Sequence, residues 1–131
     1  MTARRALARN DRGALTLSYV IIVPVFMLSV MLIVQASVWY LAKEAALAAA
    51  RQGANVARVR GATAVAGTSA ALQFARSSAS GYLISPTASS GGSSARTIWI
   101  TVSGNVPAIF PGLSLQVKQS AQAPVEKFTI P

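Results

Sequence analysis

The sequence predicts an α+β protein, in which a long N-terminal transmembrane helix continues into an alanine-rich helix and a small antiparallel β-sheet follows. Three observations predict this class. Residues 13–42 carry no charge, residues 43–80 are dense in alanine, and apolar and polar residues alternate in the region after residue 96. A chain of 131 residues has room for one membrane segment and one small domain.

The segment from Leu15 to Val34 is almost continuously apolar. About twenty such residues cross a hydrocarbon core of about 30 Å. Tyr19 near one end and the Trp39-Tyr40 pair beyond the other fit the aromatic pattern of membrane interfaces. Pro24 removes one backbone donor from the predicted helix, which indicates either a tolerated irregularity or a hinge.

Two other interpretations of this segment remain open. A cleaved secretory signal has an apolar core of about 7–15 residues, shorter than this one, although the alanines after Lys43 offer cleavage positions. The domain would then be secreted as a small binding module. A buried helix of a soluble protein would need more chain to cover it than 131 residues supply.

Basic residues precede the apolar segment, and they predict its orientation. The charge before residue 13 is +3, from four arginines and one aspartate (Arg4, Arg5, Arg9, Arg12; Asp11). Few charges follow the apolar segment directly. By the positive-inside rule we expect a single-pass protein of the cytoplasmic membrane, with the N-terminus in the cytoplasm and the rest outside.

Residues 43–80 predict two helices, one continuing out of the membrane to about Val59 and one from about Thr63, with a break near Gly61. Small residues recur every four positions along the first helix and into the break (Ala45, Ala49, Gly53, Ala57, Gly61). Such a stripe lets helices approach closely and suits packing into a bundle of subunits. An alanine-rich sequence also produces such stripes by chance.

Residues 81–96 are rich in serine and glycine and predict a flexible loop. Alternation then predicts strands over Thr97–Ser103 and Leu113–Ala121, and a third strand over Val125–Ile130 completes a β-rich exterior domain over residues 97–131. Because two strands alone are marginal, we expect the sheet to pack on the second helix or on a partner.

Composition argues against several functions. The chain has no cysteine, no histidine and three carboxylates that are far apart in sequence (Asp11, Glu44, Glu126). Acid–base catalysis and metal binding need such groups to converge, so we expect no enzyme, no metal and no cofactor. Residues 14–131 carry eight basic and two acidic residues, a charge of +6 with no basic cluster among aromatics, so we expect no nucleic-acid partner.

The stretch RGALTLSYVIIVPVFML resembles the N-terminus of TadE-like proteins, the minor pilins or pseudopilins of tight-adherence pilus systems. A second stretch, YLAKEAALAAARQGANVA, is similar to the family's alanine-rich block. The matching positions in the first stretch are a basic-Gly-Ala junction, a threonine, an aromatic residue and a proline (Arg12, Gly13, Ala14, Thr16, Tyr19, Pro24). Ser18 stands where the family usually has glutamate.

The resemblance implies a pilin-like fold and cleavage between Gly13 and Ala14 by a prepilin-type peptidase. It also implies other pilin or pseudopilin subunits and the pilus assembly platform as partners, beside the lipid bilayer, with a place in the filament or at its tip. We therefore expect a cleaved leader over residues 1–13, a transmembrane helix over 14–42, the helical region over 43–80 and the exterior parts beyond. An uncleaved single-pass scaffold of the same machinery is the alternative, and Ser18 favours it, because a hydroxyl cannot neutralise a neighbour's terminal amine.

Overall fold

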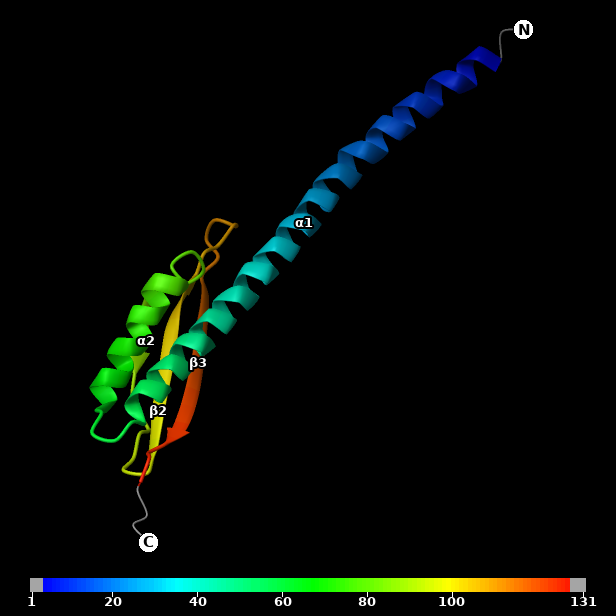
Figure 1. Ribbon diagram of the computed structural model, residues 1–131. Coiled ribbons are helices and arrows are strands. Elements are labelled where there is room, and N and C mark those ends of the chain that lie inside the picture. Colours follow the sequence, from blue (N-terminus) through cyan, green and yellow to red (C-terminus); the bar gives the residue numbers. More distant parts are fainter. Residues whose placement is uncertain (1–3, 128–131) are drawn as a thin grey trace. The chain divides into compact units, whose positions relative to one another are not determined.

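The computed structural model describes the backbone of residues 4–127, and side chains from Leu15 to Lys127. It has two helices and three strands, in the order α1 (Arg4–Ala57), α2 (Ala64–Ser78), β1 (Ile84–Ser89), β2 (Thr97–Val106) and β3 (Leu115–Pro124) (Figure 1). The predicted α+β class, with a long apolar N-terminal helix and a small antiparallel sheet, is confirmed.

The chain divides into two compact units, Met1–Gln35 and Ala36–Pro131, which we call the N-terminal and the C-terminal unit. In the described part of the N-terminal unit, the backbone is the first part of α1. The C-terminal unit contains the rest of α1, α2 and the sheet.

The two helices end and begin close to the predicted places. α1 ends at Ala57, two residues before Val59, and Gly61 has a φ of 81°, a conformation that glycine adopts without strain. The side chain of Thr63 then accepts a hydrogen bond from the backbone N–H of Ala66 and caps α2. The connection therefore reverses the chain with a glycine after one helix and a cap before the next.

The sheet has the order β1-β2-β3, and both pairs are antiparallel. β2 and β3 pair without a bulge from Thr97↔Pro124 to Val106↔Leu115. Both strands end three residues later than predicted, β2 at Val106 and β3 at Pro124. β3 also begins two residues later than predicted, at Leu115. Alternation marked their centres, but hydrogen bonding continues beyond the alternating residues.

Two predictions for the sheet were wrong. The segment expected to be part of a flexible loop over 81–96 contains β1, and Val125–Lys127 form no strand; the remainder of the predicted third strand, 128–130, lies outside the described residues. β1 is an edge strand with a bulge between Ile84 and Thr87, so Pro86, which lacks an N–H, is tolerated there. Serine and threonine mark this strand poorly because they face solvent; Thr87, for example, hydrogen-bonds Ser103 across the outer face at 2.8 Å.

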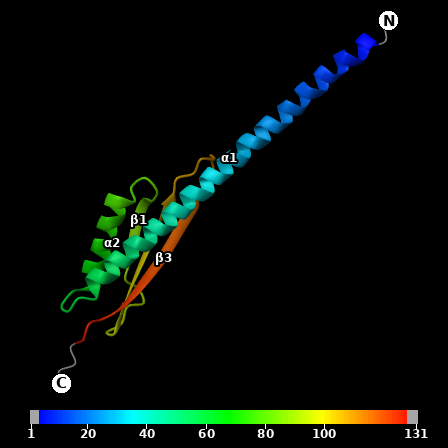
Figure 2. The same ribbon diagram turned by 45° about the vertical axis from the view of Figure 1, so that its right-hand side comes forward.

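The core of the C-terminal unit combines small helical residues with larger strand residues. α1 and α2 contribute alanines, whereas the sheet contributes isoleucine and valine, with Ile100 and Val102 fully buried. Both helices pack on the same face of the sheet, since Ile100 lies close to both Gly53 of α1 and Gly67 of α2. Figure 2 shows α2 and the later turns of α1 alongside the sheet. The expectation that the sheet packs on the second helix is thereby confirmed.

Candidate functional site: an apolar span and the helix that follows it

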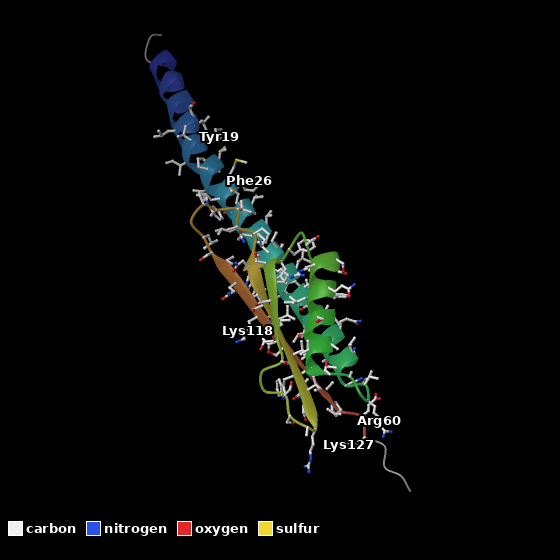
Figure 3. All side chains as sticks on the ribbon, turned by 90° about the vertical axis from the view of Figure 1, so that its left-hand side faces the viewer. Tyr19, Phe26, Arg60, Lys118 and Lys127 are labelled. Carbon is white, nitrogen blue, oxygen red and sulfur yellow. The ribbon has the colours of Figure 1, made fainter. Side chains whose placement is uncertain are left out.

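The apolar segment of α1 presents its large side chains to the surroundings. Tyr19 is 64% exposed and Phe26 is 67% exposed, and Figure 3 shows both on the outside of the helix. The other large apolar residues between Leu15 and Val34 are exposed or half-buried. Among the described residues, one helix, Leu15–Ala57, is long and apolar enough to cross a membrane, and none of its most apolar window is buried. Such an exposed apolar surface is unfavourable in water, and its length is that of a helix that could span a membrane.

The predicted cleavage junction lies within α1. Gly13 is exposed, and a Cβ placed on it would meet nothing within 4 Å. The side chain of Ala14 and those of the leader lie outside what the structure describes. The glycine is thus not required by any packing contact seen here.

The remaining motif residues follow on the same helix. Thr16 and Ser18 are exposed, and Pro24 lies inside α1 without ending it. Proline leaves the carbonyl of Val20 without its usual helical donor. Nearby, the hydroxyl of Ser29 donates to the carbonyl of Val25 at 2.8 Å, which places a polar side chain against the backbone instead of lipid. The structure supports a tolerated proline within a continuous helix.

Aromatic and basic side chains follow the span directly. Trp39 and Tyr40 are 39% and 58% exposed, and the Lys43 ammonium lies 5.4 Å from the centre of the Trp39 ring. This distance permits a cation–π interaction. An exposed Trp-Tyr pair beside a lysine is the composition that anchors helices at a membrane–water interface.

The stripe of small residues does pack helices together, but the helix it meets belongs to the same chain. A Cβ on Gly53 would lie 2.6 Å from the carbonyl oxygen of Gly67, and one on Gly67 would lie 2.6 Å from the Cβ of Ala57. Ala49, Gly53 and Ala57 are buried, Ala45 is half-buried and Gly61 is exposed beyond the end of α1. The buried three are covered by α2 and the sheet of the same chain, and packing of the stripe against other subunits stays a prediction.

Sequence reasoning missed the partners of this stripe. Gly67 and Ile100 complete the close contact with Gly53, yet neither stands out in sequence. A glycine inside a predicted helix, which costs about 1 kcal/mol relative to alanine, was the available signal at position 67.

The described surface of the C-terminal unit has open hollows that are lined mostly by neutral side chains. A hollow of about 330 Å³ lies between α1 and α2 and is lined by neutral side chains (Gln52, Val56, Ala70, Gln73, Phe74, Ser77). A second, of about 480 Å³, follows α2 and includes Arg76. Within the part of the chain that the structure describes, no group of three or more His, Cys, Asp or Glu residues could hold a metal ion.

Comparison with known proteins bears on the helix just described. The family model for TadE-like protein matches residues 13–55. This segment is TadE-like. The TadE-like match begins at the predicted cleavage junction, includes the apolar span and ends beside Gly53, so the resemblance proposed from sequence is confirmed over these residues. No curated protein and no solved structure matches the chain.

Proposed function

We propose that the chain is a membrane-anchored structural component of a tight-adherence pilus apparatus, acting as a minor pilin or pseudopilin. The observation that carries the proposal is the exposed apolar span inside the TadE-like segment. A role in tight-adherence pilus systems follows from that resemblance. The role of a minor pilin is a more specific assignment within such a system. The absence of convergent catalytic groups in the sequence favours a structural role over an enzymatic one.

The proposed mechanism has three steps. A prepilin-type peptidase cuts between Gly13 and Ala14 on the cytoplasmic side, where the basic leader holds the junction. The span from Ala14 to about Tyr40 then stores the subunit in the cytoplasmic membrane, with the C-terminal unit outside. Finally the span leaves the lipid and packs with the spans of other pilin subunits on the assembly platform.

The packing surface in this mechanism is the outside of the span, not the stripe of small residues. Large side chains such as Phe26 and Ile33 remain 67% and 66% exposed, whereas Ala49, Gly53 and Ala57 are already covered by α2 and the sheet. Lipid and neighbouring spans can exchange at such a surface at little cost, because both are apolar.

Ser18 favours an alternative, in which the chain stays in the membrane as an uncleaved scaffold. A carboxylate costs about 2.5–3.5 kcal/mol at the centre of a membrane helix and less toward its ends, and serine at position 18, near the start of the span, avoids any such cost. Serine also cannot neutralise the new terminal amine of a neighbouring subunit. The same residue therefore eases residence in lipid and removes one attraction between subunits.

The test is the N-terminal sequence and intact mass of the membrane-bound protein, with and without an active prepilin peptidase. We expect a start at Ala14 that depends on the peptidase. Gly13→Leu should abolish the cut without unfolding the chain, because nothing lies within 4 Å of a Cβ at this position. Gly81→Leu, at a second glycine with open space, is the matched control and should be cut normally.

The other outcomes separate the alternatives. A start at Met1 or Thr2 in every sample contradicts processing and supports the permanent scaffold. A start beyond about Lys43 contradicts both and supports a secreted domain released by signal peptidase.

A further inference from the structure

Hydrogen bonds identify the two ends of the C-terminal unit. The backbone N–H of Glu126 donates to the carbonyl of Arg58, and that of Val125 donates to the carbonyl of Arg96. The end of α1, the start of β2 and the end of β3 therefore lie together at one end, which we call the far end. Because β2 and β3 are antiparallel, the loop that joins them, residues 107–114, lies at the opposite end.

The turn between α2 and β1 lies at that opposite end as well. Ile84 pairs with Asn105, next to the last residue of β2, and the N–H of Leu83 donates to the carbonyl of Ala79 just after α2. Figures 1 and 2 both show the α2–β1 turn (green) and the β2–β3 loop (orange) at the same end of the sheet. Within the C-terminal unit α1 runs from Ala36 to its end beside Arg58, which lies at the far end. α1 therefore enters the unit at the end opposite the far end, and we call this the entry end.

Exposed large apolar side chains gather at the entry end. In the C-terminal unit they comprise a group on α1 near residue 40, and four residues on the two connections and at the start of β1 (Trp39, Tyr40, Leu41; Tyr82, Ile84, Ile109, Leu113). The four are 39–47% exposed. Elsewhere in the described unit the exposed large apolar residues are Val59 and Val65 beside the far end and Trp99 on the outer face of the sheet.

Charged side chains lie at both ends of the C-terminal unit. Lys43, Glu44 and Arg76 lie toward the entry end. At the far end Glu126 is 3.9 Å from Arg58, and Arg60, Arg96 and Lys127 lie nearby, so charge alone does not separate the two ends. Basic side chains beside exposed apolar ones suit a surface with anionic headgroups.

We propose that the entry end rests on the membrane surface, and that Ile109 and Leu113 on the β2–β3 loop insert into the boundary between lipid headgroups and acyl chains. Chain continuity supports lipid as the occupant. Ala36, where α1 enters the C-terminal unit, is separated from Val34, the last residue of the apolar segment, by a single residue of chain. The inference rests on the proposed membrane span and adds a second contact with the same leaflet.

The loop sequence fits shallow insertion. It reads PAIFPGLS, with no charge, two prolines and a glycine, Gly112, at a φ of 82°. The N–H of Leu113 donates to the carbonyl of Phe110 and closes a turn at the tip of the loop. These two backbone groups therefore need no hydrogen-bond partner outside the loop. A turn that satisfies part of its backbone internally can enter the interface at lower cost.

The test uses cysteines, because the natural chain has none. Ile109→Cys, labelled with an environment-sensitive fluorophore, is placed as full-length protein in vesicles that contain anionic lipid. Spin-labelled lipids quench from the headgroup level or from deep in the acyl region. We expect a blue-shifted emission and strong quenching by the shallow spin label at position 109, consistent with a depth of about 5–10 Å.

Three further labels make the outcome decisive. Ala95→Cys, exposed in the loop at the far end, should show neither the shift nor the quenching. Leu113→Cys repeats the measurement at a second site in case the change at 109 disturbs the loop. Leu28→Cys, in the span, should be quenched by the deep label.

Each result has one meaning. If the label at position 28 is not quenched by the deep spin label, the proposed membrane span is overturned. If Leu28 is quenched while Ile109 and Leu113 behave like Ala95, the span stands and the surface contact is overturned. If the shift at 109 disappears when the protein is diluted with more lipid, a second chain covers the loop, and the assignment to lipid is overturned.

Discussion

Two stretches of α1 differ in the size of their apolar side chains. Between Leu15 and Val34 the helix carries leucine, isoleucine, valine, phenylalanine and methionine, and these side chains are largely exposed. Between Ala42 and Ala57 it carries mostly alanine and glycine along the face that is buried. Side-chain size along one helix therefore indicates what surrounds it: small residues admit another backbone closely, whereas large exposed ones favour an apolar medium.

The largest expected effect on the C-terminal unit comes from its core. Ile100→Ala removes a fully buried side chain that fills the space beneath Gly53 and Gly67, and we expect a loss of about 2–5 kcal/mol in the free energy of unfolding. Chemical denaturation of the full chain in detergent, followed by near-ultraviolet circular dichroism, measures it. Val65→Ala, at a residue 70% exposed on α2, is the control and should change stability by less than about 0.5 kcal/mol. Equal effects would show that the helices do not pack on β2 as described.

A smaller effect tests the close approach of the helices directly. Gly53→Ala would put a Cβ 2.6 Å from a backbone oxygen and 2.8 Å from the Cβ of Ala71, so the helices must separate. Overpacking typically costs about 1–3 kcal/mol, and the better helix propensity of alanine offsets about 1 kcal/mol of it.

The control for Gly53→Ala is Gly81→Ala, where a Cβ meets nothing within 4 Å. We expect a lower melting temperature for the first variant and an unchanged one for the second. A Gly53→Ala protein that melts above the temperature of the unchanged chain would contradict the contact between α1 and α2.

The sequence predicts the features that depend on local patterns. The apolar span, the helix break near Gly61 and the centres of β2 and β3 follow from hydropathy, glycine and alternation. β1 escaped prediction because its pairing with β2 is a long-range property, and its serine, threonine and proline residues are typical of loops. The partner of the small-residue stripe escaped for the same reason: spacing shows that a helix can be approached closely, but not which helix approaches.

We propose that α1 serves two surroundings, lipid around the span and protein around the later turns. The most direct measurement compares the full chain with a chain that starts at Ala36, the first residue of the C-terminal unit. After extraction of membranes with alkaline carbonate, the full chain should remain with the lipid. The shorter chain should be released into buffer and unfold in one cooperative transition, because its core is complete without the span. Release of the full chain, or a shorter chain that is unfolded or aggregated in buffer, would contradict the account.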